Sequence, residues 1–277
     1  MPPRAKRLPQ VRDGSAWTKP TTMDEYSNWM KTCLSLSLTN VQKQHYESVV
    51  EKARSTFLRS SFWIELNRRL PELNSEFRLI DGYDLLLRNA EPDLDVKSYD
   101  SFLLKTFRRN CLDNKAWPTE PTGGWMIPSS WHSRINDVIR TRYIVKYLDG
   151  VEFLANRIAK IATENGLEPR IDFETKAEGY YAAHLYVTPT FEVPAISWDT
   201  EYIQLSIEIQ ITTQLQEVIL KLLHEHYEQR RKKSGLESMK WQWDYRSGEF
   251  ASNYLGHILH YVEGMIAEIR HKRTEET

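Results

Sequence analysis

The apolar residues in the first part of the chain recur with the period of a helix, beginning at Met23. This spacing predicts amphipathic helices between Met23 and Leu87, among them one over 41–57 and one over 62–70. Pro71 is expected to end the second of these, because proline has no backbone N–H to donate to the preceding turn.

The chain begins with a segment that has no periodic pattern. Residues 1–22 contain four prolines and several basic side chains, and we expect a flexible basic arm there. Thr22, at the end of this arm, is suited to cap the first helix. Asp24 and Glu25 are favourable in the first turn, because acidic side chains stabilise a helix N-terminus.

In the second half of the chain the apolar period changes to two, which is typical of strands. Strands are expected over 137–147, 184–188 and 203–211, and the last of these alternates apolar and polar residues without interruption. A helix over 151–165 should lie between them, closed by Gly166 in the position that follows a helix.

Further helices are expected over 97–110, from Gln214 onward, and over 250–273. Helices before, between and after strands predict an α/β or α+β fold, with an N-terminal helical part packed on a sheet.

The composition is that of an ordinary globular protein. Of 277 residues, 40% are apolar and 27% are charged, and the formal net charge is −1. Cys33 and Cys111 do not form a zinc-binding pattern, and no disulfide framework is expected. The N-terminus lacks the apolar stretch of a secretory signal, and no apolar segment approaches the roughly twenty residues of a membrane span. We therefore expect a cytoplasmic protein without a membrane partner.

A row of cations and a hydroxyl is predicted on the helix over 97–110. Lys97, Ser101 and Lys105 are spaced to share one side of that helix, and Arg108 or Arg109 continues the row. Such a row suits a nucleoside triphosphate, whose phosphate oxygens must be met by several cations at once. A solvated basic face is the commoner explanation of this spacing taken alone.

Two acidic residues begin or interrupt apolar strands. Asp137 stands at the start of its strand, where a carboxylate is either a Mg²⁺ ligand or an ordinary turn residue. Glu208 and Gln210 lie opposite the apolar residues of the strand over 203–211. That polar side is either an exposed sheet face, which is the usual case, or the wall of an active-site cleft.

A glycine-containing loop and a histidine complete the candidate chemistry. Gly179 permits a tight loop in which Lys176 meets phosphate and Tyr180 stacks on a base. The alternative is a plain connection between strands whose tyrosine packs on the core. His224 lies on an apolar helix stripe, where a histidine is more often a packing residue than a catalyst.

Taken in order, these segments resemble the synthetase domain of the RelA/SpoT family, which makes the alarmones (p)ppGpp. The resemblance covers roughly residues 85–230 and is specific as an ordered set. The ATP-helix pattern K-S-x-x-S-x-x-x-K-x-x-R is matched by Lys97, Ser98, Ser101, Lys105 and Arg108. The strand pattern D-x-x-x-x-R-I-x-V is matched by Asp137, Arg142, Ile144 and Val145. The acceptor loop and the E-I-Q-I-R-T strand are matched by Lys176, Gly179, Tyr180, His184, Glu208, Ile209, Gln210, Ile211 and Thr213, and a later family histidine falls on His224.

The resemblance implies a mixed sheet flanked by helices, related to nucleotidyltransferases. It implies that Asp137 and Glu208 hold Mg²⁺ and that Glu208 helps to activate a ribose 3′-hydroxyl. The ATP-binding residues would be Lys97, Ser101, Lys105 and Arg108. The acceptor-binding residues would be Lys176, Tyr180, His184, Gln210 and His224. The expected parts are the arm over 1–22, a helical region over 23–87, the synthetase domain over 88–235 and a helical extension over 236–277.

Several positions depart from the family pattern. The family's arginine after E-I-Q-I is Thr212 here, and the asparagine of its acceptor loop is Glu178. Asp95 replaces an arginine before the ATP helix, and Arg140 replaces a glycine in the strand motif. Losing a cation and gaining an acid in the acceptor region is expected to weaken the hold on the 5′-phosphates of a free nucleotide.

These departures favour an ATP-dependent pyrophosphokinase that acts on the tRNA 3′-CCA end. The chain also lacks the family's hydrolase motif, and it resembles the toxic single-domain small alarmone synthetases of toxin–antitoxin pairs. A growth-inhibiting toxin that stops translation would have an antitoxin partner. The alternative is synthesis of (p)ppGpp or (p)ppApp from guanine or adenine nucleotides. A third hypothesis, of another class, is an inactive nucleotide-binding interaction protein.

Overall fold

The computed structural model describes residues 18–87, 91–127, 131, 132, 134–196, 199–221 and 241–275. The chain forms two compact units, each assembled from three separate stretches. The first unit comprises Met1–Thr56, Val96–Ile139 and Thr190–Ser206, and the second comprises Phe57–Asp95, Arg140–Pro189 and Ile207–Thr277. Each unit is described by itself below.

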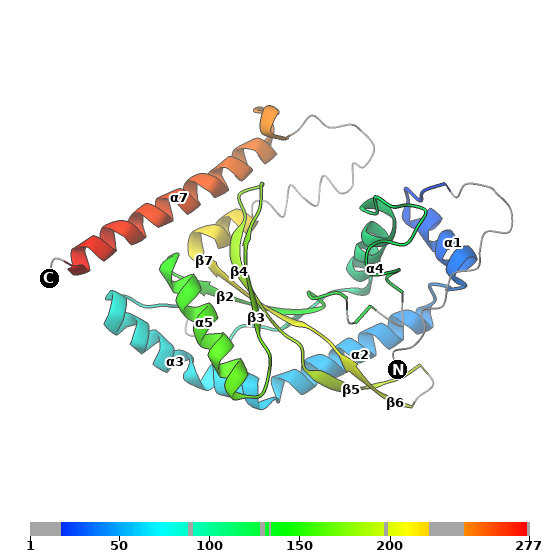
Figure 1. Cartoon of the computed structure of the whole chain (residues 1–277), viewed down its shortest axis with the longest axis horizontal. Helices are drawn as coiled ribbons and strands as arrows, with labels where there is room; N and C mark the ends of the chain where they lie inside the picture. Colours follow the sequence, from blue (N-terminus) through cyan, green and yellow to red (C-terminus); the bar gives the residue numbers. More distant parts are fainter. Residues whose placement is uncertain are drawn as a thin grey trace. The chain divides into compact units, whose positions relative to one another are not determined.

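The first unit is mainly helical and carries one hairpin (Figure 1). Its elements are α1 (Met23–Leu34), α2 (Asn40–Leu58, whose last residues belong to the second unit), α4 (Tyr99–Phe107), the π-helical turn η1 (Arg108–Leu112), β5 (Thr190–Pro194) and β6 (Thr200–Gln204). β5 and β6 pair with each other in an antiparallel two-stranded sheet. Thr22 caps α1 in a capping box with Glu25, which confirms the sequence prediction.

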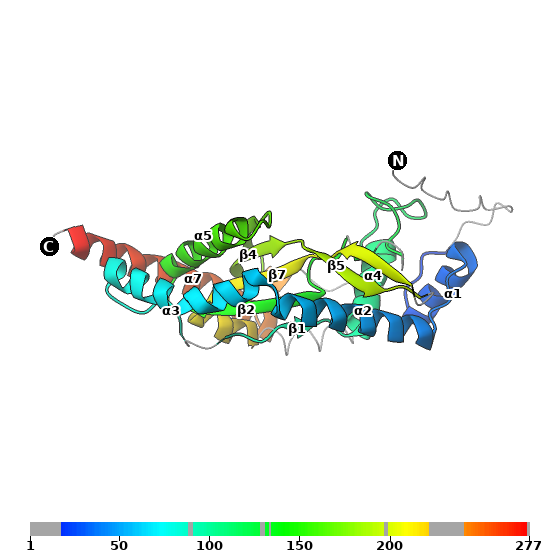
Figure 2. The ribbon, with the colours of Figure 1, turned by 90° about the horizontal axis from the view of Figure 1, so that it is seen from below.

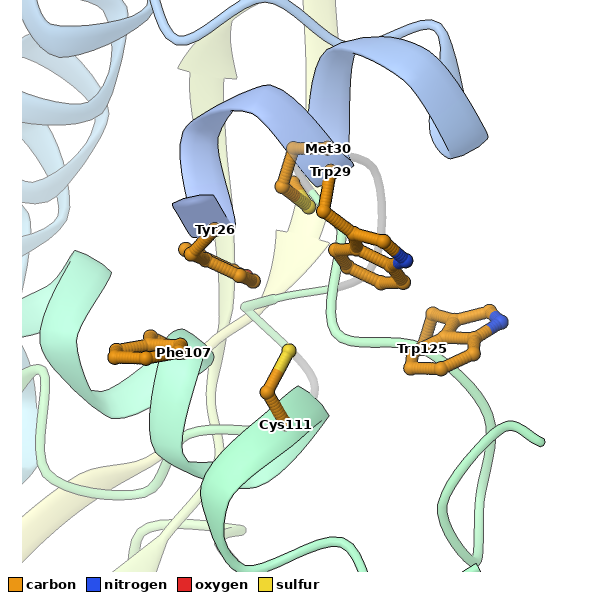
Figure 3. Close-up of a cluster of buried hydrophobic side chains, with 6 residues drawn as sticks. All are labelled: Tyr26, Trp29, Met30, Phe107, Cys111 and Trp125. Atoms are coloured by element: carbon orange, nitrogen blue, oxygen red, sulfur yellow. The ribbon is translucent and has the colours of Figure 1, made fainter. Parts of the chain in front are cut away.

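Aromatic side chains hold α1 against α4 and η1 (Figure 3). The buried Asn110 fixes this cluster, because its amide donates to the Tyr26 hydroxyl and exchanges two hydrogen bonds with the backbone of Met126. The members of the cluster are Tyr26, Trp29, Met30, Phe107, Cys111 and Trp125.

The second unit is a sheet with helices. Its elements are α3 (Ser61–Asp81), β1 (Asp95–Val96), β2 (Ile139–Val145), α5 (Asp149–Glu164), β3 (Arg170–Thr175), β4 (Tyr181–Val187), β7 (Ile207–Thr213), helical residues 214–221, the 3₁₀ turn η2 (Trp241–Trp243) and α7 (Gly248–Glu275). The unit boundaries fall within β1 and at the start of β2. The sheet is mixed and has the strand order β1-β2-β7-β4-β3, in which β4 is antiparallel to both β3 and β7. The predicted mixed α+β fold is confirmed.

Helix α5 runs along β3, β4 and β7, as both views of the ribbon show (Figures 1 and 2). The odd-numbered residues of β7, Ile207, Ile209 and Ile211, are fully buried, and so are Leu154 and Ile158 of α5. The even-numbered residues of β7 are buried too. Because β7 is buried on both faces, its polar side chains need hydrogen-bond partners within the protein.

Helix α3 continues through Pro71 to Asp81, so the prediction that Pro71 ends the helix is wrong. A proline in a helix interior costs about 3 kcal/mol. The apolar stripe nevertheless extends beyond it, since Leu70, Leu73 and Phe77 are all buried. Their packing offsets the lost backbone hydrogen bond, which the local sequence cannot show.

The predicted strand over 203–211 is two strands in two sheets. β6 ends at Gln204 and pairs with β5, whereas β7 begins at Ile207 and pairs with β4. The alternation continues through the break because Leu205 is as buried as its apolar neighbours. Alternation therefore shows which positions are apolar, but not the strand with which each half pairs. Strands β3 and β5 were not predicted.

Among the described helices, none combines the length and the continuous apolar character that crossing a bilayer requires.

Helix α7 lies directly on the loop that precedes β4. Gly179 has a φ of +77°, and a Cβ there would lie 2.4 Å from the backbone oxygen of Asn253. His257 Nε2 donates to the backbone oxygen of Ala177 at 2.9 Å, and its Nδ1 lies 2.7 Å from the Tyr181 hydroxyl. The loop and the helix thus touch backbone to backbone.

We predict that Gly179→Ala lowers the free energy of unfolding by about 2–4 kcal/mol, because it combines left-handed strain with a backbone collision. Gly166→Ala is the matched control, since Gly166 has a φ of +75° with nothing within 4 Å of a built Cβ. It should cost only about 1 kcal/mol. Denaturant unfolding of the two variants measures the difference, and equal losses would contradict the proposed contact.

Candidate functional site

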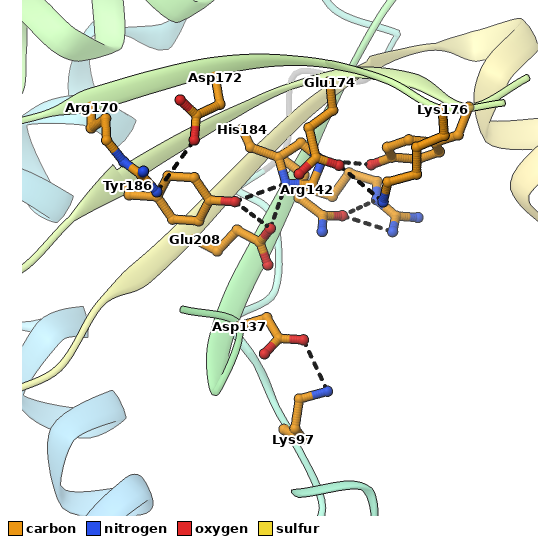
Figure 4. Close-up of polar contacts among 12 residues, drawn as sticks. Lys97, Asp137, Arg142, Arg170, Asp172, Glu174, Lys176, His184, Tyr186 and Glu208 are labelled. Atoms are coloured by element: carbon orange, nitrogen blue, oxygen red, sulfur yellow. Dashed lines mark hydrogen bonds and ion pairs between the residues drawn. The ribbon is translucent and has the colours of Figure 1, made fainter. Parts of the chain in front are cut away.

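In the first unit, Asp137 accepts ion pairs from two lysines. Its Oδ1 lies 2.6 Å from Lys105 Nζ, and its Oδ2 lies 3.0 Å from Lys97 Nζ (Figure 4 shows the second contact). Asp137 precedes β2 by two residues, and the backbone N–H of Lys97 donates to the oxygen of Val138 at 2.8 Å. A backbone bond between the two segments therefore sets the position of this carboxylate.

The Asp137 carboxylate is held in its charged form. Its burial would raise its pKa, but the charges and hydrogen bonds of Lys105 and Lys97 outweigh burial and keep the pKa below its ordinary value. The pKa of Lys105 is lowered, because burial disfavours its charged form more than Asp137 favours it. Lys105 is therefore a desolvated cation, and an anionic ligand would meet it with little water to displace.

The predicted row of cations does not lie along one helix in the structure. The helix predicted over 97–110 is present as α4 and η1, but it begins at Tyr99 and is capped by Ser98. Lys97 therefore precedes the helix, and its predicted place in the row on one helix side is wrong. Ser98 both caps α4 and donates to Ser101 Oγ at 3.0 Å, while Arg108 pairs with Asp113 at 3.5 Å. Only the two lysines share a partner.

In the second unit, the sheet gathers polar side chains from three neighbouring strands. In the registers of β3, β4 and β7, Asp172 lies opposite His184, His184 opposite Gln210, and Tyr186 opposite Glu208. Since side chains alternate along each strand, these residues share one face of the sheet. We call it the polar face.

Glu208 is 4% exposed and is bonded through one oxygen only. Its Oε1 lies 2.5 Å from His184 Nδ1 and 3.4 Å from the Tyr186 hydroxyl (Figure 4). Its Oε2 is buried and has no hydrogen-bond partner within the described ranges. The second nitrogen of His184, Nε2, lies 2.7 Å from the Tyr180 hydroxyl. Glu208 is therefore buried and does not lie on an exposed sheet face, whereas its place in an active-site cleft stays a prediction.

Gln210 belongs to a second network on the polar face. Arg142 donates from Nε and Nη2 to Gln210 Oε1 at 3.0 and 2.8 Å, and from Nη1 to Glu217 Oε2 at 2.8 Å. The amide oxygen of Gln210 is thus occupied, and its amino group is the part left to meet a ligand.

The loop before β4 places Lys176 and Tyr180 side by side. The ammonium of Lys176 lies 4.7 Å from the centre of the Tyr180 ring and pairs with Glu174 at 2.9 Å. Tyr180 is half-buried, and one side of its ring is covered by Lys176. The loop itself is closed by the N–H of Gly179, which donates to the oxygen of Lys176.

No protein-family model and no curated protein matches the chain. Solved structures do match. Small alarmone synthetase 1 from Bacillus subtilis, bound to its product pppGpp, is 14% identical with a TM-score of 0.52, covering 83% of this chain and 97% of that one. A GTP pyrophosphokinase family protein from Streptococcus pneumoniae is 18% identical with a TM-score of 0.48, covering 84% and 93% of the two chains.

This chain has the small alarmone synthetase fold. At such low sequence identity the likeness shows the fold and not the activity. The likeness extends over nearly the full length of the pppGpp-bound synthetase.

Within the small alarmone synthetase fold, the expected residues form two groups. Lys97, Lys105 and Asp137 meet in the first unit, and Lys176, Tyr180, His184, Glu208 and Gln210 line the polar face or its loop in the second. His224 lies outside the described residues. The functional roles of both groups stay predictions.

Arg142, Glu174 and Tyr186 lie next to predicted site residues and were themselves missed. Arg142 was matched in the strand motif without a role. Tyr186 follows His184 by two residues, so the period of a strand already placed both on one face. Glu174 had no signal, because β3 itself was not predicted.

Glu208 suits the divalent cation that the resemblance implies. Its buried, unpartnered Oε2 is the hard donor that Mg²⁺ prefers. Both oxygens of Asp137 contact lysines, so Asp137 would exchange one of these contacts for a metal bond. In the part of the chain that the structure describes, no three His, Cys, Asp or Glu side chains form a metal cluster. Mg²⁺ often needs only one or two carboxylates plus phosphate oxygens.

Proposed function

We propose that the chain is an ATP-dependent pyrophosphokinase that transfers the β,γ-diphosphate of ATP to the 3′-hydroxyl of a free nucleotide, as an alarmone synthetase. The observation that carries this proposal is Glu208, a buried carboxylate with one unpartnered oxygen on the polar face. The fold supports it, since a neighbour at a TM-score above one half is a synthetase bound to pppGpp.

The proposed reaction needs a base and a phosphate grip. The 3′-oxygen forms a bond to the β-phosphorus of ATP, the bond between that phosphorus and the bridging oxygen to the α-phosphate breaks, and AMP leaves. The hydroxyl proton passes to Glu208 Oε2. A carboxylate oxygen without a partner in the protein is suited to this, since a general base must contact the proton that it removes. Lys97 and Lys105 would neutralise the ATP phosphates.

Mg²⁺, held by Asp137 and Glu208, would neutralise phosphate charge when bound and make the 3′-hydroxyl a stronger acid. A carboxylate oxygen has two lone pairs, so Oε2 of Glu208 could face the ion with one and the hydroxyl proton with the other.

A tRNA 3′ end is the second candidate acceptor, and Thr212 is the observation that favours it. Thr212 is 1% exposed, and its Oγ1 lies 3.4 Å from the oxygen of Tyr181. The resemblance has an arginine at this position of β7, so one cation for 5′-phosphates is absent here. An acceptor without a 5′-pyrophosphate, such as AMP or the tRNA terminus, would need that cation less.

The acceptor is identified by incubating the protein with γ-labelled ATP and offering GDP, GTP, AMP and tRNA in parallel, with Glu208→Ala as the inactive control. We expect label in a free nucleotide and none with the variant. Label in tRNA alone would replace the alarmone synthetase with the tRNA-modifying toxin and would call for an antitoxin partner. No transfer to any acceptor would leave the inactive interaction protein, and equal label with the variant would show that Glu208 is not the base.

A further inference from the structure

His184 is a buried side chain, although the resemblance makes it a residue that binds the acceptor. It is 5% exposed, and both of its nitrogens lie within hydrogen-bond distance of protein groups. Nδ1 faces Glu208 Oε1 at 2.5 Å, and Nε2 faces the Tyr180 hydroxyl at 2.7 Å. Glu174 Oε2, at 3.8 Å from Nε2, is too distant for a hydrogen bond. No nitrogen of His184 is left for a phosphate oxygen.

The direction of these hydrogen bonds follows from their partners. A carboxylate can only accept, so Nδ1 carries a proton and donates it to Glu208 Oε1. In the neutral ring Nε2 then accepts, and the Tyr180 hydroxyl donates to it. Burial raises the pKa of Tyr180, which keeps that hydroxyl protonated. The order is therefore Tyr180 to His184 to Glu208.

We propose that His184, held in place by the Tyr180 hydroxyl, is a positioning residue that fixes the Glu208 carboxylate and leaves Oε2 as its reacting oxygen. This inference rests on the proposed function and assigns His184 a role other than binding acceptor phosphates. His184 moves no proton in it, because the proton of the 3′-hydroxyl goes to Glu208 Oε2 while the bond to Oε1 persists.

The arrangement also links acceptor binding to the base. The Tyr180 ring is the expected stacking surface for the acceptor base, and its hydroxyl supports His184. An acceptor that stacks on the ring would therefore stabilise the position of the whole chain of three residues, and with it the orientation of the carboxylate. Ligands commonly depend in this way on groups that orient the residues touching them.

Kinetics of single variants separate positioning from acceptor binding. Tyr180→Phe keeps the ring and removes only the hydroxyl. His184→Asn retains an amide N–H near the position of Nδ1, whereas His184→Ala retains nothing. We expect kcat to fall about 10- to 100-fold in Tyr180→Phe and His184→Ala, with less loss in His184→Asn, and the KM of the acceptor to stay within about twofold.

Tyr181→Phe is the matched control. The Tyr181 hydroxyl makes a hydrogen bond of the same 2.7 Å length, also to a histidine, but its partner is His257 of α7. Its kcat should stay close to that of the unchanged protein. If His184→Ala or His184→Asn instead raises the acceptor's KM without changing kcat, His184 binds the acceptor and the proposal is overturned.

A measurement without substrate tests the hydrogen bond itself. In the ligand-free protein, we expect a downfield imidazole N–H proton resonance from His184 that is lost in His184→Asn, moves in Glu208→Gln and in Tyr180→Phe, and is unchanged in Tyr181→Phe. Absence of that resonance, or its insensitivity to Glu208→Gln, overturns the proposal. If the resonance behaves as expected and no acceptor is labelled, the positioning arrangement stands and the proposed function fails.

Discussion

Glu208→Gln should reduce diphosphate transfer by about 100-fold to 10,000-fold, the range that removal of a general base produces. The substitution keeps the size of the side chain and an oxygen that accepts from His184 Nδ1. It replaces the buried, unpartnered Oε2 by an amino group that can neither take a proton nor bind a cation. The rate of transfer at saturating ATP and acceptor measures the effect.

The loss in Glu208→Gln should be chemical and not a loss of fold. Glu263→Gln is the matched control, since Glu263 is fully buried in α7 of the same unit but lies outside the polar face. Burial raises the pKa of Glu263 to about 7, so a neutral amide suits that position. We expect Glu263→Gln to transfer diphosphate at nearly the unchanged rate, and both variants to unfold near the same temperature. Diphosphate transfer at the unchanged rate in Glu208→Gln would contradict the assignment of Glu208 as the base.

Asp137→Asn should lower kcat by about 100-fold or more without raising the KM of ATP, if the carboxylate serves the metal and the lysines serve the phosphates. Losing the carboxylate frees Lys97 and Lys105, whose ion pairs with it measure 3.0 and 2.6 Å. Freed ammonium groups can still meet phosphate, so ATP binding should persist while turnover fails. Steady-state kinetics with ATP as the varied substrate separates the two constants.

Lys105→Met is expected to give the opposite pattern to Asp137→Asn, a raised KM for ATP. Asp100→Asn is the control on the same helix, because Asp100 lies exposed in the first turn of α4. It should change the kinetics little. If the KM for ATP rises equally in Asp137→Asn and Lys105→Met, then Lys97, Lys105 and Asp137 act as one structural unit. That result would contradict separate roles for the carboxylate and the lysines.

The sequence by itself determined those features that depend on a few neighbouring residues. The capping box of Thr22 and Glu25 needs two side chains on one turn, and the structure contains it. The closure of α5 needs a residue that tolerates positive φ, and Gly166 supplies it at +75°. The alternation of β7 predicted which side of the strand is polar. The ordered motifs indicated the small alarmone synthetase fold, although no family model matches.

The candidate site was only partly visible in the sequence. Period two placed Glu208 and Gln210 on one side of their strand, but whether that side is open or covered depends on β4 and its neighbours. The partner of Glu208 is His184, twenty-four residues away along the chain, and the register of β4 with β7 brings them together. Arg142 reaches Gln210 from a third strand.

Only the tertiary structure decided those features that depend on contacts between residues far apart in the sequence. Pro71 stays inside α3 because buried neighbours on both sides of it hold the helix. The stretch over 203–211 divides between two sheets because strand pairing is chosen by distant partners, and both halves bury their apolar residues equally well. Lys97 reaches Asp137 from outside the helix because a backbone bond to Val138 brings it there. The local sequence pattern predicts which positions are apolar, whereas the tertiary structure determines which residues they contact.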